Sequence, residues 1–162
     1  MSTLKEKHSE LEVKILDLFN TDLPEVLGGD LDAKYAIMGG QELNEQSKNS
    51  FSETSRIANE FLQTDIYLIS SPMWNFTIPY KLKHYIDVIM QVGILFTFTK
   101  DDVEGLVKGK KMFCVTSRGS DFSSGPDMHK YGFQEPNLRS IFGFAGIYDI
   151  SFINAQPMDY MP

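Results

Sequence analysis

The chain has 162 residues, 42% of them hydrophobic and 23% charged, which is the composition of a folded globular protein and predicts a single domain spanning residues 1–162. Its 15 Lys and Arg residues and 22 Asp and Glu residues give a formal net charge of −7, and a negative chain repels the phosphates of nucleic acids and anionic membranes. A single cysteine excludes an intrachain disulfide or CxxC pair, and without an apolar leader or a run of about 18 apolar residues we expect a cytoplasmic protein with no membrane partner.

The first half of the chain predicts one strand and two helices. Residues 12–19 alternate polar and apolar side chains and then become apolar, which is typical of a strand. A weak helix is predicted at 31–38, followed by a polar loop at 41–49. Residues 50–53 read Ser-Phe-Ser-Glu, a capping box with Ser50 as the N-cap, so a helix with one apolar stripe is expected over 51–63.

The second half of the chain alternates strands and helices. Short apolar runs at 65–70, 110–117 and 149–155 predict buried strands. Apolar stripes that begin at prolines and are followed by glycines predict helices over 79–93 and 136–146. This alternation indicates an α/β fold with a parallel sheet.

Two loops follow strands of this predicted sheet, at 70–78 and 117–132, and ligands of open parallel sheets bind beyond the carboxyl ends of the strands. The first loop holds the single tryptophan of the chain, Trp74, together with Phe76. The residues leave two interpretations equally open. Either these aromatic side chains pack against the protein itself or a second subunit, or they cover a flat aromatic ligand whose polar edge Asn75 and the loop amides bind.

The second loop is rich in Gly, Ser and Asp, so its backbone could approach a ligand closely, and Arg118 could pair with a carboxylate, a phosphate or an aromatic face. Taken alone, this composition favours an ordinary mobile surface loop. His84 and His129 are expected at the surface, and Cys114 in the core of a strand. No catalytic nucleophile, acid–base pair or metal motif is predicted.

Several segments carry a resemblance to a known family. Residues 72–87 read Pro-Met-Trp-Asn-Phe-Thr-Ile-Pro-Tyr-Lys-Leu-Lys-His-Tyr-Ile-Asp, and residues 116–119 read Thr-Ser-Arg-Gly. Further matches lie at 93–111 and at 138–147, which includes Phe-Gly-Phe-Ala-Gly-Ile. In these motifs the chain resembles the FMN-dependent NADH-azoreductases, which are flavodoxin-like NAD(P)H:quinone oxidoreductases, over nearly its whole length.

This resemblance implies a flavodoxin-like doubly wound parallel sheet with FMN at its switch point, in a homodimer whose active site lies at the subunit interface. NADH or NADPH would reduce the cofactor by hydride transfer, and a quinone or azo compound would then accept two electrons. No protein nucleophile is needed, because the cofactor carries the chemistry. The residues implied to contact the cofactor are Pro72, Met73, Trp74, Asn75, Phe76, Ser117, Arg118, Gly119 and Ser120.

The chain departs from this family at both ends, and at Ser120, where the family usually has glycine. The family opens with a strand and a Ser-rich loop that leads into a helix and holds the FMN phosphate, whereas only residues 1–10 precede the Glu12 strand here. The family also closes with a helix after its last strand. We therefore expect a fold truncated at both ends, and two alternative functions stay open: a non-catalytic family member with weak or no FMN binding, and a flavodoxin-type electron carrier.

Overall fold

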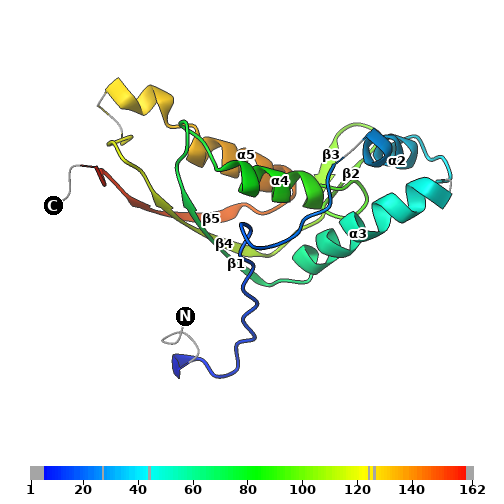
Figure 1. Ribbon diagram of the computed structural model, residues 1–162, viewed down its shortest axis with the longest axis horizontal. Coiled ribbons are helices and arrows are strands. Elements are labelled where there is room, and N and C mark those ends of the chain that lie inside the picture. Colours follow the sequence, from blue (N-terminus) through cyan, green and yellow to red (C-terminus); the bar gives the residue numbers. More distant parts are fainter. Residues whose placement is uncertain (1–5, 27, 44, 124, 126, 160–162) are drawn as a thin grey trace.

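The computed structural model describes residues 6–26, 28–43, 45–123, 125 and 127–159. Its centre is a parallel sheet of three strands in the order β1-β4-β5 (Figure 1), formed by β1 (Ile66–Pro72), β4 (Lys111–Ser117) and β5 (Asp149–Ala155). The α/β class with a parallel sheet is therefore confirmed. The three strands predicted in the second half of the chain are present, each within two residues of its expected bounds.

The helices are α2 (Gly28–Met38), α3 (Glu45–Leu62), α4 (Tyr80–Ile89) and α5 (Gln134–Phe144), with a short 3-10 helix at Asp127–Tyr131. Figure 1 shows α4 and α5 above the sheet, with α2 and α3 beyond the amino ends of its strands. A small antiparallel pair, β2 (Phe96–Phe98) and β3 (Val103–Gly105), lies between α4 and β4 in the sequence. No helix in the described ranges is both long and apolar enough to cross a membrane.

The core lies between α4 and α5 and the sheet face they cover. Met112, Cys114 and Phe142 have no exposed surface at all. The Phe61 ring stacks on Tyr67, with 4.2 Å between ring centroids, and also on Phe142 at 5.9 Å, so α3, β1 and α5 share one aromatic cluster. Such packing fixes β1 and β4 relative to the helices.

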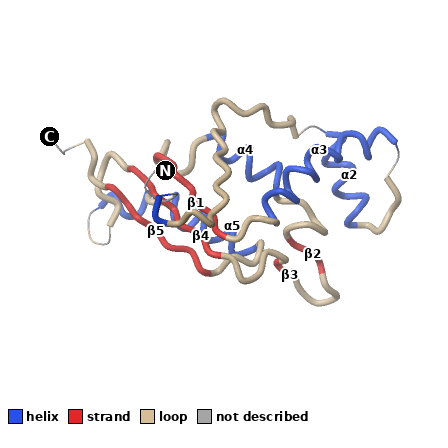
Figure 2. Tube along the Cα trace, turned by 90° about the horizontal axis from the view of Figure 1, so that it is seen from below, coloured by secondary structure: helices blue, strands red, loops and turns tan. Residues whose placement is uncertain are grey.

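The opposite face of the sheet is apolar and exposed. Ile66, Leu68 and Ile153 are 56%, 55% and 60% exposed, and Phe113 lies beside them on β4. Figure 2, seen from below, shows the strands in front with α5 behind them. The free edge of β1 borders a cavity of about 400 Å³ whose far wall is the segment 14–23.

The strand predicted at 12–19 is wrong. This segment contains no strand, and within the described ranges the backbone of residues 12–16 has no hydrogen-bonded partner. An alternating pattern specifies a strand only when another strand lies alongside to pair with it. Here the segment is held instead by side chains, such as the ion pair between Lys14 and Glu60.

The polar loop predicted at 41–49 is also wrong over its second half, because α3 begins at Glu45. Ser50 lies inside this helix, so it is not an N-cap. Glu, Gln and Lys are good helix formers, and Glu45 and Lys48 form an ion pair one turn apart, with 3.3 Å between Oε1 and Nζ. A polar composition therefore did not distinguish a loop from an exposed first turn.

Three smaller features differ from the expectation. The helix that begins after Pro79 ends at Ile89, several residues before Gly93. The last helix begins at Gln134, two residues before Pro136, since proline is tolerated in a first turn whose N–H groups need no helical acceptor. Gly146 follows this helix with φ of 103°, a conformation that suits the predicted glycine stop.

Candidate functional site

Two turns that the sequence singles out lie side by side at the carboxyl edge of the sheet. Pro72, the last residue of β1, is in register with Ser117, the last residue of β4. The Met73 N–H donates to the Ser117 carbonyl oxygen at 2.8 Å, so the contact continues beyond the strands. We call residues 73–77 the Trp74 turn and residues 117–120 the Arg118 turn. The parallel pairing of β1 and β4 is what brings them together.

The Trp74 turn is closed by two reciprocal backbone hydrogen bonds. The Trp74 N–H donates to the Thr77 carbonyl at 3.0 Å, and the Thr77 N–H donates to the Trp74 carbonyl at 3.1 Å. Between them, Asn75 and Phe76 have φ of 47° and 70°. This is the type I′ geometry, and a phenylalanine in the left-handed region costs free energy that a glycine would not.

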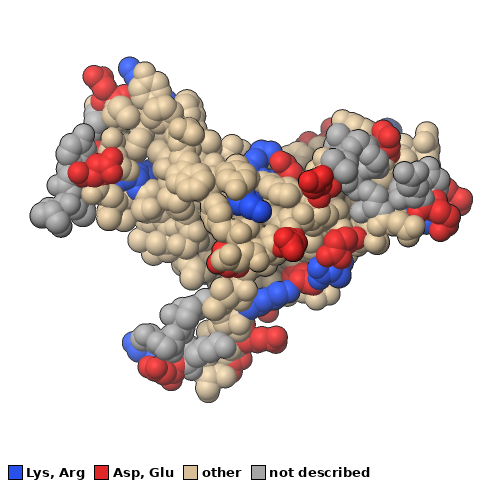
Figure 3. Space-filling model, in the orientation of Figure 1, with Lys and Arg blue, Asp and Glu red and all other residues tan. Residues whose placement is uncertain are grey.

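The aromatic side chains of the Trp74 turn are not packed into the interior. Trp74 is 43% exposed and Phe76 is 44% exposed. Trp74 contacts Phe19 edge-on at 5.7 Å between ring centroids, and Phe76 lies 5.3 Å from Tyr131. Figure 3 shows few charged groups over the connection between β1 and α4. The turn therefore presents apolar rings to solvent, at the place where a flat ligand would reach them.

The Arg118 side chain, in contrast, is buried behind the turns, with only 5% of its residue surface exposed. Its Nε donates to Gln134 Oε1 at 3.2 Å, and its Nη1 to Gln156 Oε1 at 3.4 Å. Its Nη2 lies 3.9 Å from Glu135 Oε2 and has no hydrogen-bond partner among the described residues. Burial lowers the pKa of this guanidinium, and the nearby Glu135 opposes that effect.

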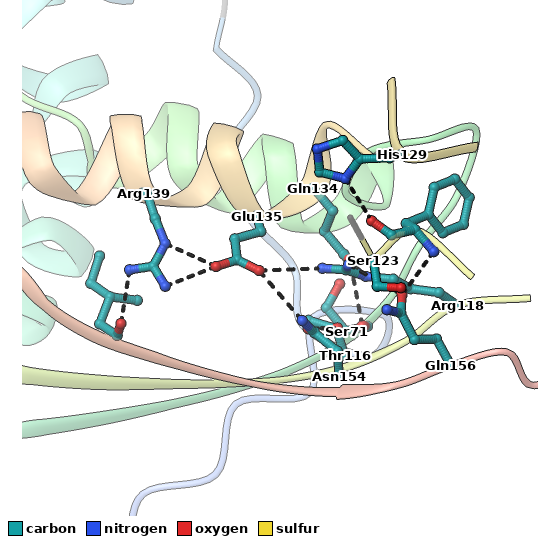
Figure 4. A network of polar contacts seen from close by, with 12 residues as sticks. Ser71, Thr116, Arg118, Ser123, His129, Gln134, Glu135, Arg139, Asn154 and Gln156 are labelled. Carbon is teal, nitrogen blue, oxygen red and sulfur yellow. Dashed lines mark hydrogen bonds and ion pairs between the residues drawn. The ribbon is translucent and has the colours of Figure 1, made fainter. Parts of the chain in front are cut away.

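Gln134 links the Arg118 turn to the end of β1, immediately before the Trp74 turn. This residue is fully buried at the start of α5. Its Nε2 donates to the carbonyl of Pro72 at 2.9 Å and lies 3.4 Å from that of Ser71, while its Oε1 accepts from Arg118. Figure 4 shows this network between α5 and the ends of the three strands. One amide therefore ties the end of β1 to the Arg118 turn.

Four backbone N–H groups of the two turns have no acceptor among the residues that the structure describes. They belong to Asn75, Phe76, Gly119 and Ser120. Unpaired backbone donors next to an exposed tryptophan are a means of binding a planar ring that carries carbonyl and imine acceptors. The residues of the turns thus fit the ring of a flavin.

The structure places each predicted site residue at this edge of the sheet, but not all in the same way. Ser117 and Pro72 are exposed, whereas Met73, Gly119 and Ser120 are half-buried. The Arg118 guanidinium is turned inward, so its contribution to a ligand would be its charge and its backbone. Gly119 lies against Asp159, whose N–H donates to the Gly119 carbonyl at 3.0 Å.

The residues expected outside the site remain outside it. Cys114 is fully buried, and burial raises the pKa of its thiol to about 11. His84 is half-buried rather than on the surface, and its Nε2 donates to the Pro24 carbonyl at 2.9 Å. His129 is exposed, and its Nδ1 donates a hydrogen bond to the Phe122 carbonyl oxygen at 3.0 Å.

The sequence interpretation missed the neighbours of the two turns. Phe19, Tyr80 and Tyr131 surround the exposed rings, and Gln134 and Gln156 hold Arg118 from behind. Gln134 precedes the helix predicted at 136–146, and a glutamine in such a position is normally exposed, so no sequence signal marked it. The aromatic residues were visible in the sequence, but their distance from Trp74 depends on the tertiary fold.

Comparison with known proteins identifies relatives of this chain. A family model described as the flavodoxin-like fold matches residues 1–162. FMN-dependent NADH:quinone oxidoreductase 3 of Pseudomonas fluorescens is 36% identical over 150 residues, which cover 91% of this chain and 69% of that protein. The crystal structure of an azoreductase from Bacillus anthracis strain Sterne matches with a TM-score of 0.86 at 27% identity, over 98% of this chain and 76% of that one.

A second solved structure from Bacillus anthracis is an FMN-dependent NADH-azoreductase in complex with FMN. It matches with a TM-score of 0.81 at 26% identity, over 99% of this chain and 79% of that one. Sequence and structure thus point to the same relatives over nearly the whole chain. The chain belongs to the flavodoxin-like family that includes the FMN-dependent NADH:quinone oxidoreductases and the azoreductases.

Proposed function

We propose that this protein is an FMN-dependent NAD(P)H oxidoreductase that reduces quinones and azo compounds by two-electron hydride transfer. The observation that carries the proposal is the pair of adjacent turns at the carboxyl edge of the sheet, with an exposed Trp74 and backbone N–H donors that no described residue accepts from. The names of the relatives supply the reaction class. The non-catalytic alternative is not favoured, because the ring-facing turns are intact.

The cofactor-binding residues in this proposal are those of the two turns. Trp74 and Phe76 would contact the flavin ring, with Pro72 and Met73 setting the start of the turn. The N–H groups of Asn75, Phe76, Gly119 and Ser120 would donate to the acceptors of the ring, and Ser117 would line its edge. All of these residues belong to one flavodoxin-like domain over residues 1–162.

FMN, when bound, supplies the hydride chemistry. The chain itself would orient the ring between the two turns and place the positive charge of Arg118 behind them. The exposed ring of Tyr131, beside Phe76, would extend the apolar surface next to the flavin, where a nicotinamide and then a quinone or azo compound can bind. No catalytic side chain is assigned.

We also propose a cytoplasmic homodimer. Two exposed aromatic residues, Trp74 at the site and Phe98 on β2, are 43% and 49% exposed, and they support a second subunit that covers part of the surface. Sedimentation analysis tests this proposal, and a protein that stays monomeric at micromolar concentration would contradict it.

The proposed activity is tested by adding FMN to the purified protein and following NADH and NADPH oxidation, with menadione and an azo dye as acceptors. We expect turnover that depends on FMN and on the acceptor. A Phe113→Ser variant is the matched control, because this exposed aromatic residue lies on the opposite face of the sheet and its loss should not change turnover. Absence of FMN-dependent turnover with either nucleotide would overturn the proposal.

A further inference from the structure

The carboxamide of Gln134 occupies a position that only a neutral amide can satisfy. On one side it faces carbonyl oxygens at the end of β1, those of Pro72 at 2.9 Å and Ser71 at 3.4 Å, which require a donor. On the other side it faces the Nε–H of Arg118 at 3.2 Å, which requires an acceptor. A glutamine side chain provides both groups in one plane, and it is fully buried here.

The contacts of Gln134 converge on the two turns rather than on the core. The carbonyls that it binds precede Met73, whose N–H bonds to Ser117. The guanidinium that it accepts from belongs to the Arg118 turn and also reaches Gln156 beyond β5. A change at Gln134 therefore alters the separation of the two turns before it alters the hydrophobic core.

We propose that Gln134 is a positioning residue that sets the spacing of the Trp74 turn and the Arg118 turn, with Arg118 as its partner. The inference rests on the proposed function, because the spacing matters for catalysis only if a flavin ring lies between the turns. Gln134 does not touch the ring in this proposal. It acts through the Pro72 carbonyl and through the guanidinium.

Two substitutions separate the donor and acceptor roles of Gln134. Gln134→Met removes both hydrogen-bonding groups at nearly constant volume. Gln134→Glu keeps the acceptor for Arg118 but sets a carboxylate oxygen against the Pro72 carbonyl unless the carboxyl group is protonated. The glutamate variant therefore regains a donor when the pH is lowered, whereas the methionine variant cannot.

Gln91 provides the matched control. It is also a buried glutamine, 4% exposed, whose Nε2 donates to the carbonyls of Val88 at 2.9 Å and Asp87 at 3.2 Å. These acceptors lie in α4, away from the two turns. Gln91→Glu thus repeats the unfavourable contact between a carboxylate and a carbonyl without acting on the site.

Two measurements report on the relative position of the Trp74 turn and the Arg118 turn. Each is made at about pH 8 and at about pH 5.5, and each variant is compared with the unsubstituted protein at the same pH. The first is the dissociation constant of FMN, from the quenching of its fluorescence. The second is the emission of Trp74 without FMN, which needs no activity and has no background from a second tryptophan. Thermal unfolding identifies any variant that fails to fold.

At about pH 8 we expect both Gln134 variants to bind FMN about tenfold or more weakly and to shift the Trp74 emission. At about pH 5.5 any recovery should be confined to Gln134→Glu, because only there can a proton on the side chain restore the donor. Unchanged FMN binding and unchanged Trp74 emission in folded Gln134 variants would overturn the inference, as would equal effects in Gln91→Glu. If Trp74 responds as expected but the unsubstituted protein binds no FMN, the positioning role is supported and the proposed function fails.

Discussion

At the scale of single residues, the Trp74 turn combines exposed rings with an unfavourable backbone. Asn75 tolerates the left-handed region well, but Phe76 at φ of 70° does so at a cost of about 1–2 kcal/mol. The strain persists because the reciprocal hydrogen bonds of Trp74 and Thr77 hold the turn.

Phe76→Gly separates this strain from the proposed function. Glycine removes the backbone strain, which stabilises the fold. The loss of the contact between the Phe76 and Tyr131 rings destabilises it by a similar amount, about 0.5–1.5 kcal/mol. We therefore expect the free energy of unfolding, measured in urea, to change by less than about 1 kcal/mol, and FMN binding to weaken. A loss of stability well beyond that range would show that Phe76 serves the fold rather than a ligand.

The sequence identified some of these residues and not others for a physical reason. Trp74 and Phe76 could be found because large aromatic residues after a buried strand are costly to expose without a function. Gln134 could not, because its burial depends on where α5 meets the end of β1. The inward turn of Arg118 was likewise invisible, since its partner Gln156 is brought to it by β5.

At the scale of elements, β3 packs closely against the carboxyl end of α5. A Cβ atom on Gly105 would lie 2.3 Å from the backbone nitrogen of Gly146 and 2.4 Å from the carbonyl carbon of Ala145. The Val107 N–H also donates to the Ala145 carbonyl at 2.9 Å. The glycine at 105 is therefore required by the contact between two backbones, not by its own conformation.

Gly105→Ala is expected to destabilise the protein by about 3 kcal/mol, because neither backbone can move without breaking that contact. The matched substitution is Gly143→Ala, in the last turn of α5, where a Cβ would meet nothing within 4 Å. It should stabilise the helix by up to about 1 kcal/mol. Urea unfolding of both variants is the measurement, and a neutral Gly105→Ala would contradict the proposed close packing.

Helices and strands could be predicted from the sequence where their hydrogen bonds form within the element or where the element is fully buried. β1, β4 and β5 have apolar runs that permit little else. The failures at 12–19 and at the start of α3 have one cause, since an exposed polar segment takes its structure from whichever partner lies beside it. The pair β2 and β3 was missed because each strand has only three residues.

At the scale of the whole molecule, the thiol of Cys114 and the hydroxyl groups of Tyr67 and Tyr85 make the stability depend on pH in the alkaline range. Burial raises the pKa of Cys114 to about 11 and that of Tyr85 to about 12, and it also raises the pKa of Tyr67. Between the unfolded and folded pKa values the unfolded chain has released protons that the native protein still holds. Stability therefore falls with rising pH in that window.

The expected result is a urea midpoint that is constant near neutral pH and decreases from about pH 9 upward. Tyr85→Phe should make this decrease shallower, because one of the titrating groups is removed. A midpoint that does not change between about pH 8 and about pH 11 would contradict the burial of these groups.

The exposed sheet face should make the isolated chain prone to association. Leu68 and Ile153 project from it at 55% and 60% exposure, so converting both to threonine removes apolar surface at little cost to the core. We expect Leu68→Thr with Ile153→Thr to bind less of a hydrophobic dye and to scatter less light, with unchanged thermal unfolding. A marked loss of stability would mean that this face is packed in the folded protein.

The most direct test of the central claim is a titration of the protein with FMN, followed through the emission of its single tryptophan. If the flavin ring lies between the Trp74 turn and the Arg118 turn, Trp74 emission must be quenched saturably, with one FMN bound for each chain and a change in the visible flavin spectrum at the same midpoint. Saturable binding that leaves Trp74 emission unchanged, or no binding at all, would contradict the account.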